Sequence, residues 1–117
     1  MAAFKPVWTE SSASQYDAIK KAAQTAARTR AKTKQTKTSK QEGLYKQVHK
    51  CIQHLLTNPK HPSLQTHEYD SLEHPYTPGQ KVFEAYAQNR TPGAYRLFWC
   101  YGPRKGEITL IAITPHP

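Results

Sequence analysis

The sequence predicts an α+β fold in which an N-terminal strand is followed by an antiparallel helical hairpin and then by a small antiparallel sheet. Apolar residues recur at helical spacing through most of the N-terminal half, whereas the last third contains three short runs rich in aromatic and β-branched residues. Short Pro- and Gly-containing turns separate these runs, which favours antiparallel pairing. The expected element order is β-α-α-β-β-β-β, in a single domain spanning residues 1–117.

The first strand is expected at residues 4–9, where Pro6 limits pairing and suggests a strand end or an edge strand. Residues 9–12 offer several N-cap side chains and predict the start of a helix. Small apolar residues then follow i, i+3, i+4 spacing and mark one narrow helix face: Ile19, Ala22, Ala23, Ala26, Ala27 and Ala31. Such a face would let a second helix approach closely.

The second helix is predicted by the clearest helical periodicity in the chain, which is formed by Leu44, Val48, Cys51, Ile52, Leu55 and Leu56. We expect Gly43 to separate the two helices, because glycine is favoured just past a helix C-terminus. Asn58 and Pro59 are expected to end the second helix, since the residue before a proline disfavours the helical region. The short connection predicts an antiparallel hairpin.

Four strands are expected in the rest of the chain. A short one is placed at residues 64–69, inside a loop rich in Pro, His, Asp and Ser. The others are placed at residues 82–88, 94–101 and 107–114. Both faces of the last strand are apolar, so we expect it to lie in the interior of the sheet.

The formal net charge of +9 is concentrated in residues 1–50, which hold eleven Lys or Arg and three Asp or Glu, a balance of +8. A basic half of this kind suits a polyanion, whose phosphates supply affinity through counterion release. A solvated helix face and an acidic protein partner fit the charge as well. The basic residues between positions 28 and 40 are scattered around the helix, so they form no single stripe.

Other functional classes are not favoured by the sequence. No apolar run approaches the roughly 18 residues that span a bilayer, and the N-terminus lacks the apolar core of a signal peptide, so we expect a cytoplasmic protein without a membrane partner. Cys51 and Cys100 are far apart and are expected to be reduced, packed thiols. His49 and His54 do not share a helix face well, and we expect neither a metal nor a cofactor.

Arg96 and His116 predict a site for an anionic ligand. Arg96 lies among aromatic residues in the middle of the three last strands, and His116 follows the end of the last one. Histidine suits acid or base work because it titrates near neutral pH. Two other interpretations stay open: Arg96 could pair structurally with Glu84 or Glu107, and His116 could be a flexible terminal residue.

Several short motifs resemble one known family by their order and spacing. They are Val7-Trp8-Thr9, Leu55-Leu56-Thr57-Asn58-Pro59, Leu64 with His67, Ala94-Tyr95-Arg96-Leu97-Phe98-Trp99, and residues 108–116. Together they resemble the RelE/ParE superfamily of toxins from bacterial toxin–antitoxin systems and span most of the chain. The resemblance implies a RelE-like fold and a cognate antitoxin, expected to be acidic, that holds the toxin inactive.

The resemblance also implies an activity. Members similar to RelE cleave messenger RNA on the ribosome, whereas others that share the fold poison DNA gyrase. Arg96 matches the arginine that contacts the scissile phosphate, and His116 falls where several members carry a catalytic histidine or arginine. His67 lies where members similar to YafQ use histidines; His61, Asp70 and His74 occupy the same region. The paired lysines of RelE have no counterpart, so a histidine-based set is the one that could be complete.

The sequence therefore predicts a ribosome-dependent endoribonuclease toxin that attacks the phosphate through the ribose 2′-OH and inhibits translation. Its catalytic residues are expected to be Arg96, His116 and His67. The residues expected to contact RNA are Arg28, Arg30, Lys32, Lys34, Tyr86 and Arg90. The alternative is a non-catalytic or gyrase-directed binding module on the same fold. The expected partners are the antitoxin, the ribosome and messenger RNA.

Overall fold

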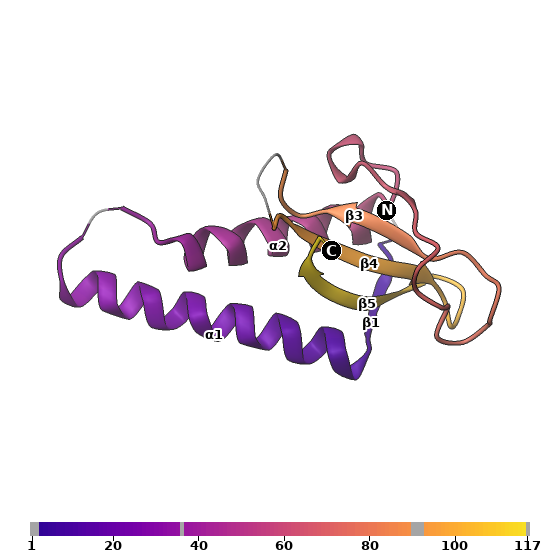
Figure 1. The fold of residues 1–117 in the computed structure, drawn as a ribbon, viewed down its shortest axis with the longest axis horizontal. Coiled ribbons are helices and arrows are strands. Elements are labelled where there is room, and N and C mark those ends of the chain that lie inside the picture. Colours follow the sequence, from indigo (N-terminus) through magenta and orange to yellow (C-terminus); the bar gives the residue numbers. More distant parts are fainter. Residues whose placement is uncertain (1–2, 36, 90–92, 117) are drawn as a thin grey trace.

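The computed structural model describes residues 3–35, 37–89 and 93–116. Its elements are β1 (Lys5–Trp8), α1 (Glu10–Lys32), α2 (Lys40–Thr57), the 3-10 helix η1 (Pro62–Leu64), β2 (His67–Glu68), β3 (Phe83–Tyr86), β4 (Tyr95–Tyr101) and β5 (Glu107–Pro115). The predicted α+β class and element order are confirmed. Helices α1 and α2 run side by side, and the end that links them projects well beyond the sheet (Figure 1).

The sheet has the strand order β1-β5-β4-β3-β2. Strands β2 to β5 pair antiparallel, as predicted, whereas β1 pairs parallel with β5 and makes the sheet mixed. A parallel pair needs a long crossover, and the whole helical hairpin supplies it here. β5 therefore lies between two neighbours, which confirms the interior position that its two apolar faces predicted. The predicted strand at residues 64–69 shrinks to β2, because Gln65 adopts a left-handed conformation with φ 47° after η1.

Both helices begin with a capping box. Thr9 accepts a hydrogen bond from the Ser12 N–H at the start of α1, which confirms the predicted N-terminus. Ser39 does the same for Glu42 at the start of α2. The prediction that Gly43 separates the helices is wrong: Gly43 lies in the first turn of α2, where the Ser39–Glu42 box satisfies the free N–H groups. α2 ends at Thr57 with Asn58 as its C-cap, as predicted.

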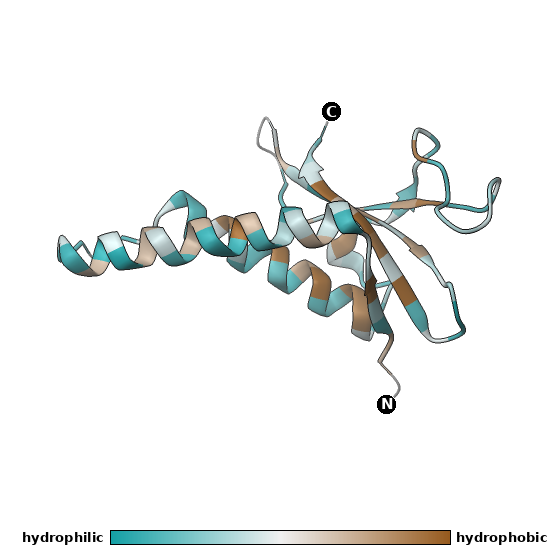
Figure 2. Ribbon diagram, turned by 90° about the horizontal axis from the view of Figure 1, so that it is seen from below, coloured by the Kyte–Doolittle hydropathy of each residue, from teal (hydrophilic) through white to brown (hydrophobic). Residues whose placement is uncertain are grey.

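The core lies between the hairpin and the sheet. Its largest fully buried apolar side chains come from α2, η1 and the strands: Val48, Leu55, Leu64, Leu97, Trp99, Ile108, Leu110 and Ile113. Figure 2 shows the most apolar residues in α2 and the strands, whereas the projecting end of the hairpin is mostly hydrophilic.

Cys51 and Cys100 are buried free thiols, and burial raises the pKa of Cys51 to about 12. No helix within the described residues is long and apolar enough to cross a membrane.

An ion pair joins the two helices near the projecting end. The Arg30 guanidinium donates to both Glu42 oxygens, with Nε–Oε1 at 3.0 Å and Nη2–Oε2 at 2.9 Å. The backbone N–H of Ser39 also donates to Glu42 Oε1, at 3.2 Å. These hydrogen bonds, first from Arg30 and then from Ser39, lower the pKa of Glu42 from 4.5 to about 2. Glu42 therefore links α2 to α1 through Arg30 and also caps the N-terminus of α2.

We expect Glu42→Gln to lower the melting temperature at pH 7 and to have little effect near pH 2. The pKa of folded Glu42 lies below its ordinary value, so its stabilising contribution is complete above pH 4.5 and is lost as the pH falls toward 2. Thermal unfolding followed by circular dichroism at both pH values measures this. Glu10→Gln, which changes an exposed acid in the first turn of α1, is the matched control. An equal loss at both pH values would contradict the assignment.

Candidate active site

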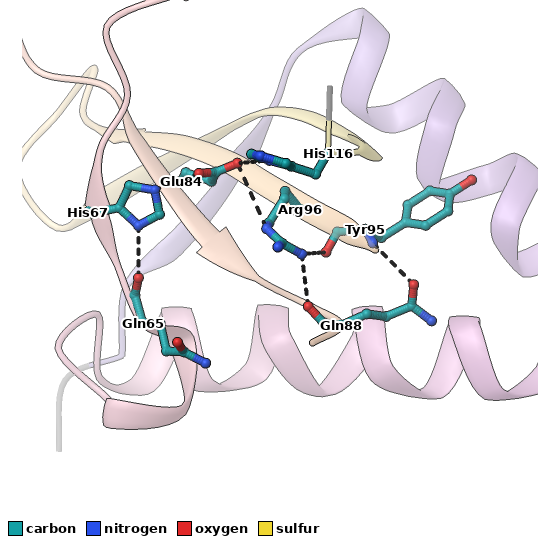
Figure 3. A network of polar contacts seen from close by, with 7 residues as sticks. All are labelled: Gln65, His67, Glu84, Gln88, Tyr95, Arg96 and His116. Carbon is teal, nitrogen blue, oxygen red and sulfur yellow. Dashed lines mark hydrogen bonds and ion pairs between the residues drawn. The ribbon is translucent and has the colours of Figure 1, made fainter. Parts of the chain in front are cut away.

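Four polar side chains from neighbouring parts of the sheet meet at one place (Figure 3). His67 comes from β2, Glu84 from β3, Arg96 from β4, and His116 directly follows β5. The register brings them together: His67 lies opposite Glu84 across the β2–β3 pair. The His116 N–H donates to the Ala94 carbonyl at 2.8 Å, which holds the chain beyond β5 against β4. The three predicted catalytic residues therefore meet around a fourth residue, Glu84.

Glu84 is the centre of this arrangement. Its carboxylate contacts His67 Nε2 through Oε1 at 2.6 Å and His116 Nδ1 through Oε2 at 3.0 Å. Arg96 Nε lies 3.9 Å from Oε2, within ion-pair range. Glu84 is 1% exposed, and a buried carboxylate is costly unless it is paired with charge or hydrogen-bonded. Sequence reasoning considered Glu84 solely as a structural partner of Arg96, and so missed the group that links both histidines.

Hydrogen-bond geometry determines which nitrogen of His116 carries a proton. A carboxylate can only accept, so His116 Nδ1 donates to Glu84. In the neutral ring this leaves a lone pair on Nε2. The side chain of His116 is 48% exposed, so a ligand can reach that ring. A histidine with one nitrogen held by a buried carboxylate and the other free is oriented to accept a proton.

His67 differs from His116 because both of its ring nitrogens contact an oxygen atom. Its Nδ1 donates to the backbone carbonyl of Gln65 at 3.1 Å, because a carbonyl can only accept. The 2.6 Å contact between His67 Nε2 and Glu84 Oε1 then requires a second proton between these two atoms. The side chain is 47% exposed. The His67–Glu84 pair thus holds a transferable proton, while His116 offers a lone pair, on the two oxygens of one carboxylate.

Arg96 is more deeply buried than the histidines, at 8% exposed. Its Nη1 donates to the carbonyl oxygens of Gln88, at 2.8 Å, and Tyr95, at 3.3 Å. Its guanidinium carbon lies 3.8 Å from the centroid of the Tyr86 ring, in cation–π geometry. Its buried Nε has no hydrogen-bond partner among the described residues. Arg96 therefore supplies positive charge beside Glu84 and also ties β4 to the chain that follows β3.

The residues predicted to contact RNA lie in two separate places. Tyr86 belongs to the site, where its ring also meets His67 edge-on with centroids 5.7 Å apart. The exposed Arg28, Lys32 and Lys34 lie toward the projecting end of the hairpin, away from the C-terminus (Figure 1). Arg30, beside them, is held by Glu42. Arg90 lies outside the described residues.

The other histidines and the acid singled out in the sequence lie in two connecting segments: His61 between α2 and η1, and Asp70 and His74 between β2 and β3. His74 Nδ1 accepts from the backbone N–H groups of Tyr76 and Thr77, so it organises its own loop. Asp70 lies in the same loop, and His61 lies against His54 beyond Tyr86. Within the described ranges, no group of three or more His, Cys, Asp or Glu side chains is arranged to hold a metal ion.

Comparison with known proteins found similarity to a solved structure over nearly the whole chain. No protein-family model and no curated protein sequence matches this chain. A solved structure described as a YoeB/ParE toxin from Agrobacterium tumefaciens aligns with a TM-score of 0.61 and 12% sequence identity, over 97% of this chain and 99% of the other. At this identity the likeness shows the fold. The fold that the RelE/ParE resemblance implied is confirmed.

Proposed function

We propose that this protein is the toxin of a toxin–antitoxin system and an endoribonuclease that cleaves messenger RNA on the ribosome. One observation carries the proposal: His67 and His116 contact the two oxygens of the same buried carboxylate, at 2.6 Å and 3.0 Å. RNA cleavage through the 2′-OH needs one base and one acid close together. The fold shared with a structure described as a YoeB/ParE toxin supports the same class.

The two histidines divide the proton transfers. His116 Nε2 takes the proton from the ribose 2′-OH as the 2′-oxygen attacks phosphorus. The bond between phosphorus and the 5′-oxygen breaks, and the leaving oxygen takes the proton held between His67 and Glu84. The products are a 2′,3′-cyclic phosphate and a 5′-hydroxyl end. The Glu84 carboxylate stabilises the imidazolium that forms on His116, and the charge of Arg96 offsets negative charge on the phosphorane.

The remaining surface fits the proposed partners. Tyr86 lies beside Arg96 with its ring in position to stack on a base. Arg28, Lys32 and Lys34 are exposed on the projecting end of the hairpin, where they can contact ribosomal phosphates at a distance from the cleavage site. The net charge of +9 suits an acidic antitoxin, and both the ribosome and such an antitoxin imply a cytoplasmic location.

We expect His116→Ala to abolish cleavage while leaving the fold intact. The substitution removes the base, which is worth about 100-fold or more in rate, and the side chain is 48% exposed beyond the last strand. The measurement is induction in a bacterial host with mapping of new messenger RNA 5′ ends. His49→Ala is the matched control, because His49 is an exposed histidine on α2 whose ring contacts Tyr16 and Tyr45.

Three outcomes are informative. Codon-positioned cuts that persist with His49→Ala and vanish with His116→Ala would support the nuclease. Cuts that persist with His116→Ala would remove that residue from the mechanism. Growth arrest without any cuts would favour the alternative, a gyrase-directed or purely binding module on the same fold.

A further inference from the structure

A cavity of about 450 Å³ opens between α2, η1 and β3, and its lining includes Tyr86, over whose ring Arg96 lies. The polar and aromatic side chains that line it are Gln47, Lys50 and His54 from α2, His61 and Ser63 from the segment that follows, and Tyr86. Its volume lies in the range of small-ligand sites, roughly 300–1,000 Å³. None of the residues that line it is acidic. Tyr86 therefore belongs both to the candidate active site and to the lining of a cavity that has no acidic residue.

We propose that this cavity binds the base of the nucleotide next to the scissile phosphate and that it prefers guanine. The inference rests on the proposed nuclease function, since it names the part of the RNA that the same site would hold. Proteins bind unstacked RNA bases by stacking them on Tyr, His or Phe and by hydrogen-bonding their edges. The cavity offers both kinds of contact, and its lining includes Tyr86, whose ring contacts Arg96.

The aromatic surface comes from a pair of histidines. His54 and His61 stack with ring centroids 4.0 Å apart and an interplanar angle of 27°. Burial, followed by the electrostatic effect of the neighbouring His61 and Lys50, lowers the pKa of His54, which favours the neutral ring that suits stacking. Tyr86 lines the cavity as well, and Arg96 lies over its ring. A flat base is therefore the ligand shape that these rings accommodate.

Hydrogen-bond geometry fixes which ring nitrogen of His61 carries its hydrogen and makes that nitrogen a donor. Its Nδ1 accepts from the Ser63 backbone N–H at 3.1 Å, and a backbone N–H can only donate. The Ser63 hydroxyl lies 2.7 Å from the same nitrogen. The neutral ring must then carry its hydrogen on Nε2. Lys50, with its ammonium hydrogens, is a second donor on the lining.

The same reasoning fixes the amide of Gln47. The Tyr95 backbone N–H donates to Gln88 Oε1 at 3.1 Å, so the Gln88 amide has one allowed orientation. Gln88 Nε2 then donates to Gln47 Oε1 at 2.8 Å. Gln47 is left with its amino hydrogens to offer, as a third donor. The backbone N–H of Tyr95, which precedes Arg96 in β4, thus fixes the orientation of the Gln47 amide through Gln88.

The three donors from Gln47, Lys50 and His61 favour a base edge that accepts hydrogen bonds. Guanine presents two adjacent acceptors, N7 and O6, whereas adenine presents N7 beside an amino group that would face donors. A matched pair of such contacts discriminates between bases by about five-fold to 100-fold. We therefore expect guanine to bind at least about five-fold more tightly than adenine.

The test is an NMR titration of the full chain with 2′-deoxyguanosine 3′-monophosphate and 2′-deoxyadenosine 3′-monophosphate, neither of which can be cleaved. We expect the guanine nucleotide to shift the imidazole signals of His54 and His61 and to bind at least about five-fold more tightly than the adenine nucleotide. Gln47→Leu should reduce that preference by removing one donor. Gln53→Leu, which changes an exposed glutamine on α2 outside the cavity lining, should keep it.

The outcomes separate this inference from the nuclease proposal, because the readout requires no cleavage. Guanine-selective shifts at His54 and His61 in a protein that does not cut RNA would support the base site and reject the nuclease. Equal affinity for both nucleotides, or shifts confined to His67 and His116, would overturn the base site. Unchanged selectivity in Gln47→Leu would overturn the donor argument on which the guanine preference stands.

Discussion

Glu84→Gln is expected to reduce RNA cleavage by about 100-fold or more, because Glu84 contacts both histidines that transfer protons. An amide has one acceptor oxygen, whereas the carboxylate of Glu84 faces hydrogen-bearing nitrogens of His67 and His116 on its two oxygens. In the variant one histidine must face an NH₂ group and give up its orientation. The negative charge that stabilises the imidazolium is also lost. Glu84 is therefore proposed as the positioning residue of the site.

The measurement is the cleavage rate of a defined messenger RNA on purified ribosomes, with the melting temperature of each variant measured in parallel. Glu68→Gln is the matched control, because Glu68 is a neighbouring acid in the sheet whose partner is the exposed Lys81. We expect the control to cleave at the wild-type rate. A folded Glu84→Gln protein that cleaves at the wild-type rate would exclude the proposed division of proton transfers.

The helices could be predicted because helix formation depends on the spacing of residues that are close together in the sequence. Val48 and Leu55, seven residues apart, face the core as their spacing indicated. Gly43 lies inside α2 and not at a helix end, because the Ser39–Glu42 capping box just before it starts the helix at Lys40. Both signals are local, and the capping box, which satisfies backbone groups on both sides, determines where α2 begins.

The meeting of the site residues depends on strand register, which is not local. Glu84 lies between Phe83 and Ala85 in an apolar strand, and a lone carboxylate there is a readable sign of a buried charge. Its contact with His67 arises from pairing across the intervening loop. Likewise, β1 was predicted as a strand, but its parallel pairing with β5 depends on the path of the hairpin between them. The sequence determines the residue types of the site, and the strand register brings these residues into contact.

Arg96→Ala is expected to destabilise the fold by about 3–5 kcal/mol, the usual cost of removing one partner from a buried ion pair. Arg96 is 8% exposed and Glu84 is 1% exposed, so the variant leaves the carboxylate without its nearest permanent cation. The carbonyls of Gln88 and Tyr95 also lose the hydrogen bonds from Nη1. Urea unfolding of the purified protein measures the loss. Arg104→Ala, which changes an exposed arginine in the turn before β5, should alter stability by less than about 0.5 kcal/mol.

This expected result changes how an inactive Arg96 variant should be interpreted. A domain of this size is stable by about 5–15 kcal/mol, so Arg96→Ala would deplete the folded protein as well as remove a charge from the site. Arg96→Lys separates the two effects, because lysine keeps the charge but lacks the planar guanidinium whose Nη1 binds two carbonyls and whose face lies over Tyr86. A stable Arg96→Lys protein without cleavage would give Arg96 a chemical role. Activity that follows the folded fraction in both variants would make Arg96 structural and leave the chemistry to His116, His67 and Glu84.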